Sequence, residues 1–200
     1  MQILNVKELS IEGVFVIQCK RTFDERGYFG EVFRKSDFEN ELLPETIRKS
    51  HFLQINESFS FKNTFRGLHF QSNPPQAKCV RCIDGHLIDL ALDIRSESKT
   101  YGKILAYEII STPEDEFFEW IWLPHGIAHG TLLLENSKLE YLCTSEWNPE
   151  TNYEVSIYSA DIDWSFCEEK ILSRIQTAIN NPDLKISPKD KSAKTFNIRK

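Results

Sequence analysis

The sequence lacks any apolar run approaching the roughly 18 residues that a membrane-spanning helix needs, so we expect no membrane segment. Its first residues, MQILNVKELSIEG, lack the basic segment, apolar core and small-residue cleavage site of a signal peptide, which predicts a cytoplasmic protein. Positive charge is also scarce: 24 Lys and Arg residues against 30 Asp and Glu residues give a net charge of −6. This balance argues against a general binder of nucleic acids or anionic membranes.

The chain has only five cysteines, which is an odd number. This usage fits free thiols in a reducing compartment better than a disulfide framework. Cys79 and Cys82 form a CxxC pair, but their segment has the pattern of a strand, in which positions three apart point to opposite faces. No second CxxC pair is present to complete a zinc site, so we expect no metal there.

Helical periodicity is sparse, and most of the chain has the pattern of short extended segments separated by turn residues. Helices are predicted over residues 36–43 and 168–179. The dipeptide Asp84-Gly85 separates two extended segments and predicts a hairpin turn. Strands are predicted over residues 14–19, 28–33, 51–58, 64–70, 78–84, 87–95, 103–111, 117–123, 130–134 and 138–145.

The clearest strand covers residues 87–95. Its even-numbered positions are apolar, whereas Asp89, Asp93 and Arg95 make the other face polar, as in a barrel strand whose polar side lines a pocket or meets water. A chain of 23.3 kDa can bury a sizeable core without covalent staples. We therefore expect one antiparallel β domain over residues 1–200, with a C-terminal helix and tail (about 168–200) as an appendage whose far end frays.

The segment Arg66–Gln71, RGLHFQ, carries a residue suited to acid–base chemistry. In an extended strand Gly67 and His69 share one side and Arg66 lies on the other, so the small glycine leaves space in front of the imidazole. Histidine has the ordinary pKa of a general base at neutral pH. Lys78 follows after a short turn and could stabilise an oxyanion, while a tyrosine could return a proton. Such groups can remove a proton beside a carbonyl and redeliver it.

Seven sequence motifs follow one another along the chain. They are DERGYF (24–29), QINESFS (54–60), RGLHFQ (66–71), QAK (76–78), DLALDIRSESKTYG (89–102), LPHGIAHG (123–130) and SPKD (187–190). Together they resemble the dTDP-4-dehydrorhamnose 3,5-epimerase family. The resemblance implies an all-β, cupin-type antiparallel jelly-roll barrel with short accessory helices. It also implies a homodimer with residues shared between pockets, and no metal or organic cofactor.

The implied substrate is a nucleoside-diphospho-4-keto-6-deoxyhexose, epimerised at C3, C5 or both. By the same resemblance, His69 matches the general base and Asp190 the carboxylate that orients it. Lys78 matches the residue beside the 4-keto oxygen, and Tyr141 the proton donor on the opposite face. In the family, Arg26 and its neighbours reach the pocket of the partner subunit. The positions matched to binding of the sugar or the nucleotide are Arg26, Phe29, Glu31, Gln54, Asn56, Arg66, His129, Trp147, Glu154 and Lys189.

Three alternatives remain open beside an epimerase of cell-surface polysaccharide or deoxysugar biosynthesis. A mono-epimerase or ketoisomerase acting on a related nucleotide sugar would use the same residues. A metal-dependent cupin enzyme fits the element PHGIAH (124–129), but such an enzyme also needs an HxH element, and here His69 is followed by Phe70-Gln71. A non-catalytic cupin that only binds a sugar nucleotide would not need both an acid and a base, which the set with Lys78 and Tyr141 supplies.

Overall fold

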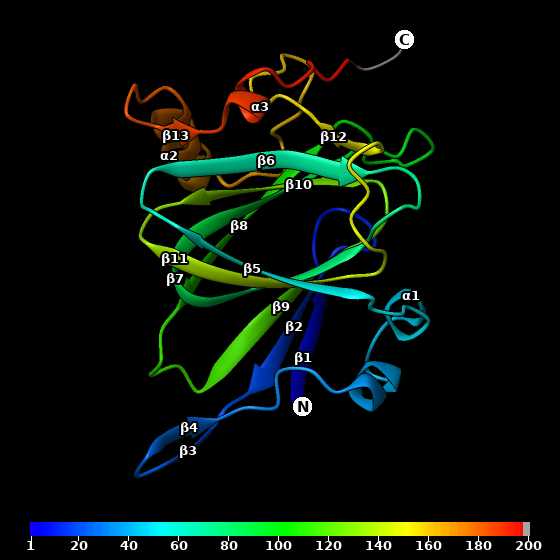
Figure 1. The fold of residues 1–200 in the computed structure, drawn as a ribbon, viewed down its shortest axis with the longest axis vertical. Coiled ribbons are helices and arrows are strands. Elements are labelled where there is room, and N and C mark those ends of the chain that lie inside the picture. Colours follow the sequence, from blue (N-terminus) through cyan, green and yellow to red (C-terminus); the bar gives the residue numbers. More distant parts are fainter. Residues whose placement is uncertain (198–200) are drawn as a thin grey trace.

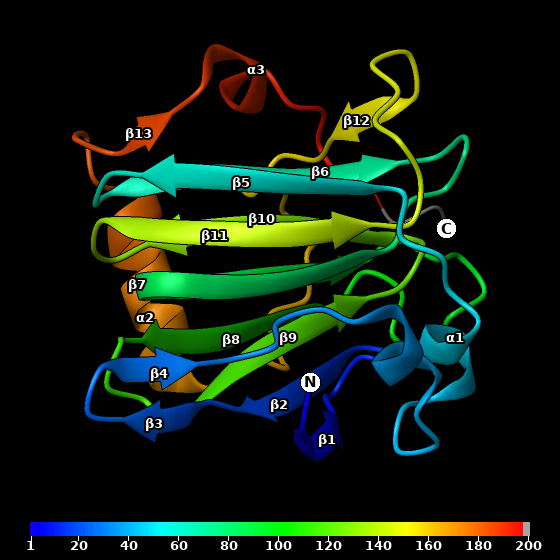
Figure 2. The same ribbon diagram turned by 60° about the horizontal axis from the view of Figure 1, so that its bottom comes forward.

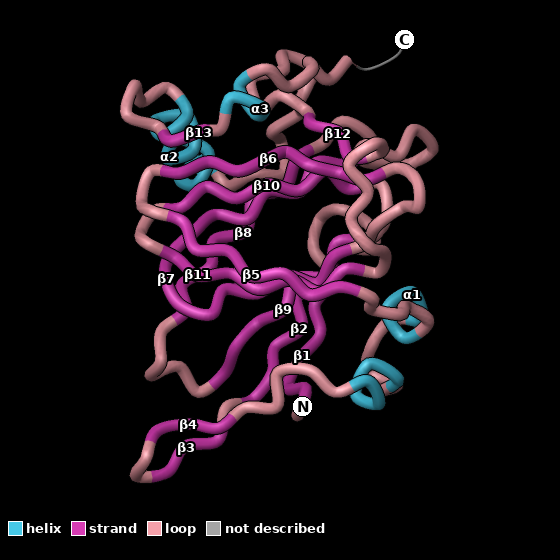
Figure 3. The backbone as a smooth tube through the Cα atoms, in the orientation of Figure 1, coloured by secondary structure: helices cyan, strands magenta, loops and turns pink. Residues whose placement is uncertain are grey.

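The computed structural model describes residues 1–197 and is built mainly of antiparallel strands (Figure 1). The strands are β1 (Ile3–Glu8), β2 (Phe15–Lys20), β3 (Thr22–Asp24), β4 (Gly27–Phe29), β5 (Gln54–Ser60), β6 (Thr64–Gln71), β7 (Lys78–Asp93), β8 (Ile104–Ser111), β9 (Phe117–Leu123), β10 (Ile127–Leu133), β11 (Ser137–Cys143), β12 (Asn152–Glu154) and β13 (Lys185–Ile186). The helices are a 3-10 helix (Lys35–Glu39), α1 (Glu45–Arg48), α2 (Glu169–Ile179) and α3 (Pro188–Lys191), and they lie outside the layers of strands (Figure 3).

Within the described residues, eleven strands join in one sheet that folds over on itself, because β7 belongs to two layers. The first half of β7 pairs with β9 and β11, and its second half pairs with β8 and β10. The first layer runs β1-β2-β9-β7-β11-β5 and the second runs β8-β7-β10-β6-β12. The second layer lies above the first in Figure 1, and the β3–β4 hairpin projects below both. Figure 2 shows β5, β11 and β7 side by side. This arrangement confirms the predicted antiparallel jelly-roll class.

The predicted hairpin at Asp84-Gly85 is wrong, because β7 continues without a turn from Lys78 to Asp93. Asp84 still pairs with Lys138 in the first layer, whereas Gly85 already pairs with β8 in the second. Gly85 has φ +120°, and a Cβ there would lie 2.3 Å from the Ser137 hydroxyl oxygen. A glycine inside a strand marks a bend or a close backbone approach. Here the bend carries β7 from one layer into the other.

Three buried clusters stabilise the layers. One joins residues of both layers and includes Cys82 and Leu87. A second covers the outer side of the second layer, where Ile175 of α2 packs in the same cluster as Leu90. The third packs the chain around the 3-10 helix and α1 against the first layer and includes Cys79. The prediction that Cys79 and Cys82 point to opposite faces is therefore confirmed.

Short elements account for most differences from the predicted pattern. The helix predicted over residues 168–179 is confirmed as α2. The helix predicted over 36–43 is instead the 3-10 helix, and α1 begins after Pro44, since Pro44 suits a helix start but not a helix interior. The strands β1, β3, β12 and β13 and helix α3 were not predicted, because most of them are too short to show periodicity. The predicted fraying falls on residues 198–200, outside the described residues.

No helix within residues 1–197 combines the length and the apolar character needed to cross a membrane.

Candidate active site

A cavity of about 810 Å³ lies between the two layers. Its walls come from β5, β6, β7, β10 and β11, and the segment around β13 and α3 also lines it. It brings together residues that are up to 136 positions apart, as between Gln54 and Asp190. The predicted site residues that line it are Gln54, Asn56, Arg66, His69, Lys78, His129, Tyr141, Trp147, Lys189 and Asp190.

The strand β6 places both Arg66 and His69 in this cavity, which corrects the expectation that they lie on opposite sides. The pairing of β6 with β10 shifts between His129↔His69 and Thr131↔Arg66, so β6 holds one residue more than its partner here. Such a bulge reverses the alternation of side chains along a strand. Gly67 lies within the bulge at φ +125°, where a Cβ would be only 2.7 Å from the His129 carbonyl oxygen. The bulge thus lets Arg66 and His69 both face the same cavity.

Asp190 and His69 form a close pair on the β6 wall. His69 Nε2 lies 2.6 Å from Asp190 Oδ1, and the Asp190 side chain is 5% exposed. The Ser187 hydroxyl caps α3 by accepting a hydrogen bond from the Asp190 amide at 3.0 Å, which fixes the residue at the cavity edge. Burial raises the pKa of the Asp190 carboxyl, but hydrogen bonds from His69 and from the Gly67 amide outweigh burial and hold that pKa below its usual value.

A second histidine–carboxylate pair lies beside the first. His129 pairs with His69 across β10 and β6, and its Nε2 lies 2.7 Å from Oδ2 of Asp89 on β7. Both side chains are nearly inaccessible, at 12% and 2% exposure. Sequence reasoning did not name Asp89 as a site residue, although a carboxylate between the apolar residues of the strand 87–95 is a signal that could have found it. The second half of β7 therefore does present a polar side chain towards the site, as its alternation predicted.

Lys78 of β7 and Tyr141 of β11 come from the first layer, opposite the His69–Asp190 pair. Burial lowers the pKa of the Lys78 ammonium, an effect that nearby Asp89 partly opposes. Burial also raises the pKa of the Tyr141 phenol, so the phenol keeps its proton at neutral pH. The cavity thus has the His69–Asp190 pair on one wall and an amine and a phenol on the other.

Polar side chains of β5 and β6 continue the lining towards Trp147. Gln54 Nε2 donates to Asn56 Oδ1 at 2.8 Å, and the Trp147 amide donates to Gln54 Oε1 at 2.8 Å. Arg66 Nε donates to the Ser60 hydroxyl at 2.8 Å, which orients the guanidinium. The Trp147 side chain is 56% exposed and can offer an aromatic face to a planar ring.

Glu154 and Lys189 form an ion pair beside the cavity. Lys189 lines the cavity, but Glu154 does not, although it pairs with His69 between β12 and β6. Asn152 Nδ2 donates to Glu154 Oε1 at 3.2 Å and itself lines the cavity. Glu154 therefore contacts two residues that line the cavity, Lys189 and Asn152.

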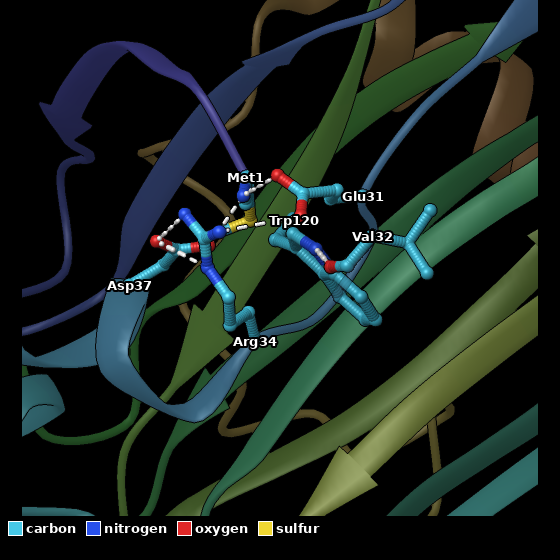
Figure 4. A network of polar contacts seen from close by, with 6 residues as sticks. All are labelled: Met1, Glu31, Val32, Arg34, Asp37 and Trp120. Carbon is cyan, nitrogen blue, oxygen red and sulfur yellow. Dashed lines mark hydrogen bonds and ion pairs between the residues drawn. The ribbon is translucent and has the colours of Figure 1, made fainter.

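The structure does not bring Arg26, Phe29 and Glu31 to this chain's own cavity. Arg26 lies on the β3–β4 hairpin and forms a 2.6 Å ion pair with Asp24, while Phe29 is 72% exposed. Figure 4 shows Glu31 in a separate network, where it accepts a hydrogen bond from the Met1 amino group at 2.9 Å. In the same network Arg34 pairs with Asp37, and the Trp120 indole donates to the Val32 carbonyl at 3.0 Å.

Within residues 1–197, no three histidine, cysteine, aspartate or glutamate side chains are grouped as ligands for a metal ion. The two histidines of the cavity each contact a carboxylate, Asp190 for His69 and Asp89 for His129.

The comparisons with known proteins agree with this fold. The sequence profile of the dTDP-4-dehydrorhamnose 3,5-epimerase family matches residues 8–197. The dTDP-4-dehydrorhamnose 3,5-epimerase of Methanothermobacter thermautotrophicus is 37% identical over 158 residues, covering 78% of this chain and 80% of that protein. The enzyme of the same name from Escherichia coli K12 is 35% identical over 174 residues, covering 85% and 90%.

Solved structures extend the similarity to three dimensions. The crystal structure of dTDP-6-deoxy-D-glucose-3,5-epimerase from Legionella pneumophila Philadelphia 1, in complex with dTDP-4-keto-L-rhamnose, superposes with a TM-score of 0.77. It is 30% identical in sequence and covers 96% of this chain and 92% of its own. The chain belongs to the dTDP-4-dehydrorhamnose 3,5-epimerase family.

Proposed function

We propose that this chain inverts C3, C5 or both in a nucleoside-diphospho-4-keto-6-deoxyhexose, with dTDP as the nucleotide. The observation that carries the proposal is a single cavity in which His69 and Asp190 lie on one wall and Lys78 and Tyr141 on the other. Inversion beside a ketone requires a base on one face, an acid on the other and a donor for the enolate oxygen. The cavity supplies all three.

His69 is the proposed base. The Asp190 carboxylate accepts the Nε2–H of His69, so the lone pair of the neutral imidazole lies on Nδ1. The proton beside the ketone moves to Nδ1, and the electron pair of the broken C–H bond delocalises onto the 4-keto oxygen as an enolate. Asp190 stabilises the imidazolium that forms.

Lys78 and Tyr141 are the proposed partners of the enolate. The Lys78 ammonium donates to the developing O4 anion, and in a buried site this interaction is stronger than in water. The Tyr141 phenol then delivers its proton to the carbon from the face opposite His69, and the carbon is inverted. Solvent water restores the proton of Tyr141 and removes the one on His69.

Arg66, Lys189, Gln54 and Asn56 supply cationic and N–H donors at the rim, which is the chemistry that binds a diphosphate. Trp147 lies at the Gln54 end of β5 and can stack on the nucleobase. The nucleotide sugar would therefore lie with its hexose between His69 and Tyr141.

We further propose a homodimer in which the β3–β4 hairpin reaches the partner's cavity. Exposed Arg26 and Phe29 on that hairpin support this arrangement, as do exposed Ile55 and Phe59 on the edge strand β5. Light scattering should then give twice the 23.3 kDa chain mass, and a monomeric mass would contradict it. We place the enzyme in the cytoplasm, because its free cysteines fit a reducing compartment.

Proton NMR of dTDP-4-keto-6-deoxyglucose incubated with the protein in D₂O tests the proposed reaction. Deuterium should replace hydrogen at C3, C5 or both, together with the appearance of an inverted sugar. Exchange and inversion at a single carbon would identify a mono-epimerase, and migration of the carbonyl would identify a ketoisomerase. Binding of the sugar nucleotide without exchange at either carbon would contradict the proposal.

A further inference from the structure

A continuous set of hydrogen bonds runs along the β5 and β11 wall of the cavity. The Trp147 amide donates to Gln54 Oε1, Gln54 Nε2 donates to Asn56 Oδ1, and Asn56 Nδ2 donates to Cys143 Sγ at 3.6 Å. We call these four residues the amide network. It connects the Trp147 end of the cavity to the strand that carries Tyr141.

The direction of the amide network is fixed at one end. A backbone N–H can only donate, so the Trp147 amide requires the oxygen of the Gln54 side chain to face it. The Gln54 NH₂ group must then face Asn56, which turns the Asn56 oxygen towards Gln54. The Asn56 NH₂ group is left facing the sulfur, so Cys143 must serve as the acceptor.

Cys143 lies where this acceptor is needed. It pairs with Gln54 across β5 and with Lys78 across β7, and it follows Tyr141 by two positions on β11. Its residue exposure is only 1%, so its sulfur contacts the protein rather than solvent. Burial raises the pKa of the Cys143 thiol, against opposing effects of Lys78 and Asn56, so the sulfur stays a neutral acceptor.

We infer that Cys143 is a positioning residue for substrate binding. Its sulfur is the last acceptor of the amide network and holds the Gln54 and Asn56 side chains in place. Their oxygens accept hydrogen bonds within the network, and their remaining N–H groups are available to the cavity. This inference rests on the proposed function. Each NH₂ group has two hydrogens, of which the amide network uses one. The other can donate to an anionic oxygen, so this wall suits the diphosphate of the nucleotide sugar.

Removal of the acceptor should therefore weaken binding of the diphosphate and leave the rate of the proton transfers unchanged. In Cys143→Val the side chain keeps a similar shape but cannot accept, so the Asn56 N–H that faces it loses its partner and the Asn56 side chain is no longer held in place. Losing one or two charge-assisted hydrogen bonds should raise the Kd for dTDP and the KM for the sugar nucleotide about tenfold. The kcat should stay within about twofold, because neither Gln54 nor Asn56 transfers a proton in the proposed reaction.

Two further variants separate positioning from general packing. Cys143→Ser keeps an acceptor and should restore the Kd for dTDP to within about threefold of wild type. Cys79→Val is a matched control, because Cys79 is a buried thiol on the neighbouring strand that lies in an apolar cluster. It should leave the Kd, KM and kcat unchanged. Cys143→Ala removes the acceptor without adding volume and replaces the valine variant if the latter does not fold.

Isothermal titration calorimetry with dTDP and steady-state kinetics on each folded variant give the answer. A wild-type Kd for dTDP in the Cys143→Val or Cys143→Ala variant would overturn the inference while leaving the proposed function intact. A loss of kcat equal to the rise in KM, without rescue by serine, would also overturn it, since that pattern indicates general loosening. A wild-type protein that does not bind dTDP would refute the proposed nucleotide, and this inference with it.

Discussion

Replacing Asp190 with asparagine should lower turnover about 10³- to 10⁴-fold. Asp190 Oδ1 lies 2.6 Å from His69 Nε2, and a carboxylate can only accept, so it keeps the imidazole proton on Nε2 and the lone pair on Nδ1. An asparagine NH₂ group in the same place can donate to Nε2, which moves the imidazole proton to Nδ1 and removes the base. The wrong tautomer costs about 10⁴ in a comparable histidine–aspartate pair, or about 5 kcal/mol of activation free energy.

The rate of deuterium uptake at C3 and C5 of the substrate in D₂O measures this effect, and the Kd for dTDP checks that binding is retained. A rate within tenfold of wild type would refute the claim that Asp190 sets the tautomer of His69. Urea unfolding provides a second readout. Because the pKa of Asp190 is depressed in the folded state, its carboxylate stabilises the fold above the ordinary aspartate pKa, and this stabilisation is lost as the pH falls through the folded pKa. As the pH is lowered below about 5, the free energy of unfolding should therefore fall less for the asparagine variant than for wild type.

Three other substitutions test separate parts of the account. Tyr141→Phe should still allow deuterium uptake but slow formation of the inverted sugar at least tenfold, and inversion at the wild-type rate by NMR would assign the proton donor elsewhere. Lys78→Met should reduce the initial rate about 10²- to 10³-fold, as expected for loss of an oxyanion donor, and a rate within threefold would exclude that role. Gly85→Ala should lower the free energy of unfolding in urea by about 3 kcal/mol, because a side chain at φ +120° would also meet Ser137 at 2.3 Å, whereas a loss below about 0.5 kcal/mol would contradict the close approach.

The layered β architecture was predictable because most of its strands are long enough to show alternation or β-rich composition. Four of the strands that line the cavity, β5, β6, β10 and β11, were predicted with bounds within three residues of those observed. The CxxC segment was also read correctly as a strand with two faces. These features depend on side-chain periodicity, which is local information.

The wrong predictions occurred where one local sequence pattern is compatible with two different structures. Asp84-Gly85 is typical of a hairpin turn, but the same glycine also permits a bend within one long strand, and only the pairing of β7 with both layers distinguishes the two. The bulge in β6 is equally hidden, because the extra residue is defined by the register against β10. Strict alternation therefore placed Arg66 on the wrong side of the strand.

The candidate site depends on contacts between distant segments that no local pattern contains. Asp190 reaches His69 from 121 positions away, and only the resemblance of the SPKD element placed it there. Asp89 and Cys143 were missed, because each acts behind a residue that lines the cavity. Arg26 and Phe29 were assigned to binding, but the structure of one chain leaves them on an exposed hairpin.

The most direct test of the account compares wild type with His69→Asn, each incubated with dTDP-4-keto-6-deoxyglucose in D₂O and followed by NMR. Deuterium should appear at C3, C5 or both with the wild-type protein and not above background with the variant, while both proteins bind dTDP with similar Kd. Wild-type deuterium uptake by the folded His69→Asn variant would contradict the central claim that this imidazole removes the proton.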